Sequence, residues 1–310
     1  MKYINIPDIN LKEAINEALQ NNSGERSLHQ DITEEEILSI TTLYANSREI
    51  YNLTGLRYAK NITYLNLPFN NIKDISELKY LTKLEKIVLW HNNIEDLTPI
   101  EKLINLKHLE IDDNQIISIE PLKNLTSLVT LWASFNKIRN VEPLRNLINL
   151  RYLYLNNNEI KDIDILKNLT NLEYLGLHYN KIENVDMLNN LTKLKILGIS
   201  KNSINDLSQL SNLSLEDGFF AWDQTITMNI SKKDDKAYTL DLSLLKDRED
   251  KVINITDLES GTYDKEKNII KWDKTYLPHT ISFKFNNGML EYENNSFYGS
   301  VIVNIEENKS

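Results

Sequence analysis

An asparagine recurs every 22 residues through the middle of this 310-residue chain, and no other sequence feature constrains the fold as strongly. The apolar residues repeat with it in the frame Leu-x-Leu-x-x-Asn-x-Ile-x-x-Ile-x-x-Leu-x-x-Leu-x-x-Leu. A fixed period of this length indicates stacked units, each of which needs its neighbours to bury its apolar side. The recurring asparagines are Asn70, Asn92, Asn114, Asn136, Asn158, Asn180 and Asn202.

Two different spacings within each repeat predict its local structure. The Leu-x-Leu stretch has period two, which predicts a short strand with both leucines turned inward. The later apolar residues fall at every third position, which favours a 3₁₀-like or extended return. Together these features predict a leucine-rich repeat of the 22-residue class, an α/β solenoid whose strands form a concave parallel sheet.

We expect each recurring asparagine to have a structural role at the point where its strand ends. Its amide can both donate and accept, so it can satisfy backbone groups of the bend and of the adjacent coil. Arg48 stands at this position in a degenerate first repeat, and Gln224 stands there after the last strand.

The sequence divides into three predicted regions. Residues 1–42 are predicted to be a helical N-terminal cap. Apolar residues at helical spacing follow Asp8, which predicts a first helix, and Thr33 with Glu36 forms a capping box that predicts a second. Residues 43–226 form the leucine-rich repeat domain, and residues 227–310 alternate as the short strands of a β-sandwich do. The expected sandwich strands are 227–230, 237–242, 252–258, 269–272, 280–285, 289–292 and 300–305.

The three regions, in this order, resemble the internalin family of bacterial surface proteins. The resemblance rests on the cap ending at residues 31–38, on returns such as Leu-Ile-Asn-Leu at 103–106, and on the segments 261–263 and 280–285. It implies an immunoglobulin-like fold for residues 227–310. It also implies a secreted or cell-surface protein of a Gram-positive bacterium, non-enzymatic and monomeric, that binds a protein, often a host receptor, on its concave face.

Composition excludes several classes of function. The formal charge of −10 argues against nucleic acid as a partner, and no apolar run is long enough for a membrane helix. The absence of cysteine excludes disulfide scaffolds, thiolate zinc sites and cysteine nucleophiles. We recognise no catalytic motif and expect no cofactor. Residues 1–8 have no apolar signal core, which predicts either a cytosolic chain or the mature segment of a secreted protein.

Aromatic residues gather at the strand positions that are expected to face the hollow side. Aromatic side chains are typical of binding hot spots, although strands also favour them without any function. Phe69 and Phe135, which directly precede the asparagine, are weaker candidates, because a side chain at this position can tuck against the edge of the ladder. The predicted partner-binding residues are Tyr64, Trp90, His108, Glu110, Asp112, Trp132, Tyr152, Tyr154, Tyr174, His178, Tyr179, Phe220 and Trp222.

Three carboxylates, Glu110, Asp112 and Asp113, form an acidic step midway along this face, with His91 and His108 nearby. We interpret the step as a contact for a basic patch of the partner. A metal site and pH-sensitive binding through histidine are the alternatives.

The predicted function is therefore binding of a protein partner, with no nucleic acid and no membrane insertion. The alternative is an intracellular regulatory scaffold of the phosphatase-regulator type, which the predicted sandwich disfavours. An enzyme acting on cell-wall glycan is the third possibility, and no paired acid and base in a cleft supports it. A signal peptide at the start of the unprocessed gene would exclude the scaffold.

Overall fold

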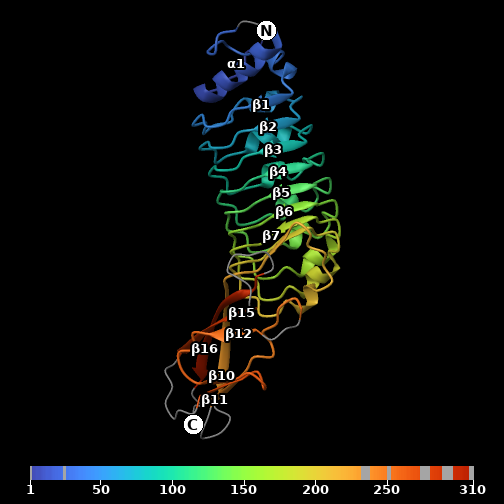
Figure 1. Cartoon of the computed structure of the whole chain (residues 1–310). Coiled ribbons are helices and arrows are strands. Elements are labelled where there is room, and N and C mark those ends of the chain that lie inside the picture. The colour runs from blue at the N-terminus through green and yellow to red at the C-terminus, as the bar shows by residue number, and fades with distance from the viewer. Residues whose placement is uncertain are drawn as a thin grey trace. The chain divides into compact units, whose positions relative to one another are not determined.

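The computed structural model describes residues 2–23, 26–231, 238–249, 253–272, 280–287 and 296–306 (Figure 1). Its internal contacts group into two compact units, residues 1–160 with 168–172 and residues 161–167 with 173–310. Each unit contains several repeats. The domain boundaries expected after residues 42 and 226 follow the sequence pattern rather than these contacts and stay a prediction.

The strands of the first unit form a parallel sheet in chain order (Figure 1). Each residue of a strand lies opposite the residue 22 positions later, so the register follows the repeat. The strands are β1 Thr42–Tyr44, β2 Tyr64–Asn66, β3 Lys86–Val88, β4 His108–Glu110, β5 Thr130–Trp132 and β6 Tyr152–Tyr154.

Each return contains a short 3₁₀ turn, as the three-residue spacing predicts. The leucines of the strands and the apolar residues of the returns are almost fully buried, as Leu131 and Leu144 illustrate. Burial of one such side chain is worth about 1.5–3 kcal/mol, and every coil repeats the set. The turns are η2 Leu56–Tyr58, η3 Ser76–Tyr80, η4 Thr98–Ile100, η5 Glu120–Leu122, η6 Glu142–Leu144, η7 Asp164–Asn168, η8 Asp186–Asn190 and η9 Ser208–Leu210.

The recurring asparagines hydrogen-bond to two coils at once. The Nδ2 group of Asn92 donates to the carbonyl of Leu89 at 3.0 Å in its own coil and to that of Leu67 at 3.0 Å in the preceding coil. Its Oδ1 atom accepts the N–H of Ile72 at 3.0 Å. These bonds satisfy backbone groups that the bend leaves without partners. The same pattern recurs at Asn114, Asn136 and Asn158.

The two substitutions at this position behave differently. Gln224 is fully buried, and its amide donates to Ile199 O at 3.0 Å and accepts the N–H of Ile204 at 3.0 Å, so it replaces asparagine in the ladder. Arg48 instead turns its guanidinium to the carboxylate of Glu17 in the preceding helix. The first coil therefore uses this position to bind the N-terminal segment.

The residue before each asparagine has a left-handed backbone, which the sequence did not reveal. Its φ angle lies between 51° and 59° in every coil. A non-glycine residue loses about 1–2 kcal/mol in this conformation, so glycine is the residue that usually signals it. The aromatic and charged residues found at these positions do not predict it. The residues are Ser47, Phe69, His91, Asp113, Phe135, Asn157, Tyr179, Lys201 and Asp223.

The prediction that Phe69 and Phe135 tuck against the ladder is wrong. The two residues are 45% and 57% exposed. The left-handed bend carries their side chains away from the buried asparagine column.

A helix, α1 Ile9–Ser23, precedes the repeats. The fully buried carboxylate of Asp8 accepts the N–H of Leu11 at 3.1 Å at the start of this helix. Its second oxygen accepts the N–H groups of Tyr51 and Asn52, at 2.9 and 3.0 Å, in the first coil. One side chain thus joins helix and coil, and the role of this segment as a cap stays a prediction.

The predicted second helix is a single 3₁₀ turn, η1 Glu36–Ser39. The capping box is present: Thr33 Oγ1 accepts the N–H of Glu36 at 3.2 Å, and the Glu36 carboxylate accepts the N–H of Thr33 at 2.8 Å. The hydrogen bond from Arg26 is the main reason that the pKa of Glu36 falls to about 2. The turn ends at Ile40 because the chain must be extended to enter β1.

In the second unit the repeats continue as a parallel sheet of β7 Tyr174–Gly176, β8 Ile196–Gly198 and β9 Gly218–Phe220. Two further sheets follow, with strand orders β10-β16-β15-β12 and β11-β14-β13. Large side chains such as Trp272, Phe283 and Phe285 are buried there. Their strands are β10 Gln224–Ser231, β11 Tyr238–Asp241, β12 Asn254–Thr256, β13 Thr262–Asp264, β14 Ile269–Trp272, β15 Thr280–Asn286 and β16 Tyr298–Glu306.

Two sheets with buried aromatic residues fit the predicted β-sandwich, and an immunoglobulin-like topology stays a prediction. Strand β13 was not predicted as a strand, and the expected strand at 289–292 lies outside the described residues. Strand β10 begins at Gln224, the last residue of the ladder, so no linker separates the repeats from these sheets.

Candidate functional site

The side chains that alternate with the buried leucines on β1 to β9, together with the two residues before each ladder position, form what we call the sheet face. Equivalent positions on paired strands lie about 4.8 Å apart, so rows of side chains run across the strands. All the predicted partner-binding residues lie on this face, and each is partly or well exposed. The face is described here separately for each unit.

At the start of the first unit, charged and aromatic side chains share one cluster. The rings of Tyr44 and Tyr64 meet edge to face at 5.3 Å, and the ammonium of Lys86 lies 5.2 Å from the Tyr64 ring centroid. Lys86 also forms an ion pair with Glu110 at 3.0 Å. Burial lowers the pKa of Lys86, but the hydrogen bond and charge of Glu110 outweigh it, so the pKa is raised.

A second cluster joins Trp90 to the left-handed positions. The Phe69 ring packs on the edge of Trp90, with centroids 4.3 Å apart, and lies 4.7 Å from the His91 imidazole. The His91 Nδ1 atom contacts the carboxylate of Asp113. Trp90 is therefore held from one side while part of its surface stays open.

A third cluster is the ring pair of Trp132 and Tyr154 on the neighbouring strands β5 and β6. Their centroids are 5.7 Å apart at an interplanar angle of 82°, an edge-to-face contact. Trp132 is 40% exposed. The adjacent Tyr152 ring has the guanidinium of Arg151 5.5 Å from its centroid. Such ring contacts fix the orientation of a tryptophan that stays open to solvent.

Asp112 lies between these aromatic clusters and is half-buried. Its Oδ1 atom accepts the N–H of Ser134 at 2.8 Å. Burial nevertheless raises the pKa of Asp112 to about 6. Within the described part of the chain no lysine, arginine or histidine forms an ion pair with Asp112, whereas Glu110 is paired with Lys86 and Asp113 with His91.

His108 lies on the same strand as Glu110. Its Nδ1 atom is 3.0 Å from the hydroxyl of Thr130. Burial lowers the pKa of His108, and the positive charge of Lys86 adds to the effect. Both effects favour the neutral imidazole, which can serve as a polar contact.

In the second unit, His178 lies between two aromatic rings. Its imidazole stacks on Trp222 with centroids 6.2 Å apart and lies 6.4 Å from Phe220. The Nδ1 atom accepts the N–H of Ser200 at 3.2 Å, and burial lowers the pKa of the imidazole. Gly198 makes room for the ring, because a Cβ atom there would collide with it.

The remaining predicted residues of the second unit, Tyr174 and Tyr179, lie apart from that cluster. The Tyr174 hydroxyl is 3.5 Å from the carboxylate of Asp217. Tyr179 occupies a left-handed position, and its exposed ring has the ammonium of Lys201 5.5 Å from its centroid.

Sequence reasoning missed Tyr44, which is 58% exposed and packs on Tyr64. The signal was available, because Tyr44 lies 22 residues before Asn66 and so occupies the same position of the degenerate first repeat. It also treated Phe69 and Phe135 as weaker candidates, although both rings are exposed on the sheet face.

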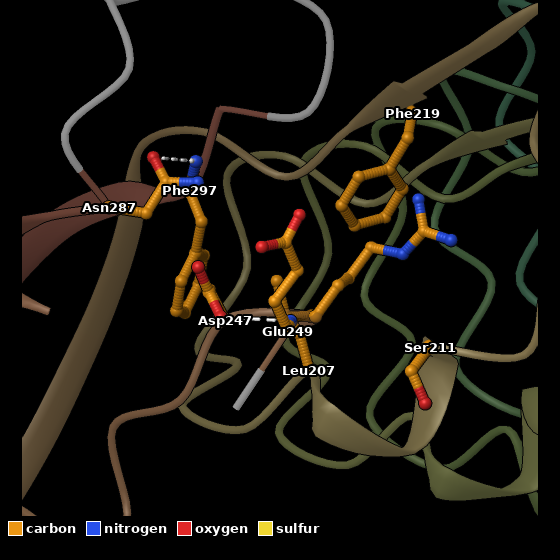
Figure 2. A pocket seen from close by; sticks show the side chains of 8 residues that line it. Leu207, Ser211, Phe219, Asp247, Glu249, Asn287 and Phe297 are labelled. Atoms are coloured by element: carbon orange, nitrogen blue, oxygen red, sulfur yellow. Dashed lines mark hydrogen bonds between the residues drawn. The ribbon is translucent and has the colours of Figure 1, made fainter. Parts of the chain in front are cut away.

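A pocket of about 400 Å³ lies in the second unit, away from the sheet face (Figure 2). One of the residues that line it is Arg248, whose guanidinium lies 4.9 Å from the Phe219 ring centroid and donates to the carbonyls of Leu213 at 2.6 Å and Leu210 at 3.3 Å. Those carbonyls belong to the last return. The geometry therefore gives Arg248 a structural role, closing the final coil.

Two further observations concern metal-binding groups and membrane-spanning helices. Among the described residues, no group of three potential metal-ligating side chains lies close together. No helix in this part of the chain is both long enough and apolar enough to cross a membrane.

Comparisons with known proteins agree with the repeat architecture. A family model described as leucine-rich repeats (2 copies) matches residues 60–103, 104–146 and 148–190. A comparison with curated proteins gives no match.

Many solved structures are similar to this chain, and three of them serve as examples. Internalin C2 of Listeria monocytogenes is 31% identical, with a TM-score of 0.64 over 71% of this chain and 98% of that one. InlP of Listeria monocytogenes has a TM-score of 0.62 at 18% identity, over 96% and 97% of the two chains. The plant peptide hormone receptor RGFR1, in complex with RGF2, has a TM-score of 0.56 at 21% identity, over 64% and 34%. The last two likenesses concern the fold alone.

Proposed function

The chain belongs to the internalin family, and we propose that it is a protein-interaction module that binds its partner through the sheet face. The observation that carries the proposal is the set of exposed rings on that face, above all Trp132 packed edge to face on Tyr154. An exposed tryptophan side chain is not required for the strand to fold. It does supply the large contact area that interface hot spots use.

The ring contacts also prepare the face for binding. Trp90, Trp132 and Trp222 each pack against a neighbouring ring in the free chain. Binding would therefore cost little side-chain entropy, which favours affinity. Six strands at a spacing of about 4.8 Å extend the first unit's face over roughly 24 Å, which suits a protein surface rather than a small molecule.

We further propose that the protein is a secreted or surface-exposed bacterial ligand, monomeric and without a cofactor, whose partner is a host surface receptor. Its relationship to internalin C2 of Listeria monocytogenes supports this assignment. The two sheets that directly follow the last repeat argue against an intracellular scaffold of the phosphatase-regulator type.

The test is a binding screen of the full chain against an array of host-cell ectodomains, followed by single alanine variants. Trp132→Ala and Trp222→Ala should each weaken binding about thirtyfold, because an anchoring ring is worth roughly 2 kcal/mol. Tyr80→Ala is the matched control, since Tyr80 is an exposed ring on the return between strands.

Melting temperatures of the same variants separate binding from folding. Loss of binding in Tyr80→Ala but not in Trp132→Ala or Trp222→Ala would contradict the proposal. Unfolding of Trp132→Ala would show that this ring belongs to the core, and the face assignment would then be wrong.

A further inference from the structure

We propose that Asp112, flanked by Trp90 and Trp132, receives a lysine or arginine side chain of the partner protein. We call these three residues the cation socket. The proposal rests on the proposed function, because it names the chemistry that the sheet face recognises.

The backbone brings the three residues of the socket from three consecutive coils. Trp90 and Asp112 hold the same position in adjacent coils, and the N–H of His91 donates to the carbonyl of Asp112 at 2.9 Å. In the following coil, Trp132 lies opposite Glu110 and is therefore a diagonal neighbour of Asp112. Trp90 and Trp132 thus come from the coils on either side of Asp112, and each is at least partly exposed.

Asp112 differs from the two carboxylates beside it. Glu110 forms an ion pair with Lys86 from strand β3, and the carboxylate of Asp113 contacts His91 Nδ1 from the preceding coil. Asp112 accepts hydrogen bonds from Ser134 and from its own N–H, but no cation pairs with it among the described residues. A half-buried carboxylate in this state is poorly stabilised, and its pKa of about 6 reflects the desolvation.

The surroundings favour a basic side chain as the occupant. The negative charge of Asp112 repels anions, and an apolar group would bury the carboxylate without compensation. A lysine or arginine would pair with it while its cation lies against indole faces, the strongest partners for cation–π contact. The other charged or titratable groups facing the socket are Lys86, His91, His108, Glu110 and Asp113, and Lys86 is already engaged by Glu110.

The test uses a display library of random 12-residue peptides, selected on the full chain at pH 7.5. Peptides that bind the Trp132→Ala variant equally well are discarded, which leaves those that use the sheet face. We expect the remaining peptides to be enriched in lysine or arginine at one position. Their affinity should fall at least tenfold with Asp112→Asn.

Asp113→Asn is the matched control, because it removes the same charge one residue away and asparagine tolerates the left-handed backbone there. It should change affinity less than twofold. Wild-type affinity should fall from pH 7.5 to pH 5.5, since Asp112 becomes protonated, and Asp112→Asn should lose most of this dependence.

Two outcomes would overturn the proposal in different ways. Sheet-face peptides that lack an enriched cation, or that bind Asp112→Asn and wild type equally, would exclude the socket while leaving the proposed function intact. If Asp112→Asn and Asp113→Asn lower peptide affinity equally, the loss would come from the net negative charge of the face, and the socket would also be excluded. If no selected peptide depends on Trp132, both the cation socket and the proposed function are excluded.

Discussion

The asparagine column and the sheet face are neighbours on each coil, yet they follow opposite rules. Asn136 is buried and makes the same hydrogen bonds as Asn114 and Asn158. Trp132 is exposed, and the residues at its position in neighbouring coils are Glu110 and Tyr154. The column is constant because each coil must satisfy the same backbone groups. The face is variable because the bends do not depend on hydrogen bonds from its side chains.

The two regions also differ in what they contribute to stability. The column satisfies buried N–H and C=O groups, each of which would cost about 1–3 kcal/mol if left unpaired. The face includes left-handed residues and a desolvated carboxylate, both of which work against folding. Residues that a fold tolerates at a cost are the ones to examine for function.

The largest effect should come from removing the N-terminal segment. Deletion of residues 1–42 exposes Leu43 and Ile50, which are fully buried, and removes the bonds from Asp8 to the first coil. We expect insoluble protein or loss of the cooperative unfolding transition, measured by soluble yield and circular dichroism. A soluble truncated chain with an unchanged melting temperature would show that the column needs no cap.

The next effect should come from breaking the column itself. Asn114→Ala leaves the carbonyls of Leu89 and Ile111 and the N–H of Ile94 without the side-chain partner that they have now. We expect the free energy of unfolding to fall by about 3 kcal/mol or more, measured by urea denaturation. Asn93→Ala, at an exposed asparagine, is the control and should stay within about 0.5 kcal/mol.

A smaller effect on the free energy of unfolding is expected from Gly198, which lies under the His178 ring on the sheet face of the second unit. Gly198→Ala places a Cβ atom against the His178 ring, which must move away from Trp222. We expect a loss of about 1–2 kcal/mol in the free energy of unfolding. The double variant Gly198→Ala with His178→Ala should recover part of it. Simple additivity of the two single effects would rule out the steric explanation.

The smallest effect, opposite in sign, should come from Asp112. Its folded pKa of about 6 lies above the ordinary aspartate value of 3.8, so the folded chain binds this proton more tightly than the unfolded chain does. The resulting penalty is present above pH 6 and disappears as the pH falls toward 4. Asp112→Asn should therefore raise the free energy of unfolding at pH 7.5 by about 1 kcal/mol or less.

Urea denaturation of Asp112→Asn at pH 7.5 and pH 4 measures this gain. Relative to the wild type, the gain should be absent at the lower pH. A variant that is less stable than the wild type at pH 7.5 would mean that the carboxylate stabilises the fold, and the contrast between column and face would be weaker than we infer.

How much of the molecule could be predicted depends on how often a position recurs. The strand register, the inward leucines and the positions of the sheet face follow from the 22-residue period, because every coil gives the same position the same surroundings. Tyr44 was missed where the first repeat is degenerate, and strand β13 was missed where no repeat exists.

The sequence by itself therefore determined the coil, its hydrogen-bonding asparagine and the side of the strand on which each aromatic residue lies. Only the tertiary structure decided which of those residues pair, that Phe69 and Phe135 turn outward on left-handed bends, and that no described residue provides a cation for Asp112. The physical reason is that period and hydrophobicity report on burial within one coil. Ring packing, backbone strain and charge pairing arise between neighbouring coils, whose side chains at these positions differ.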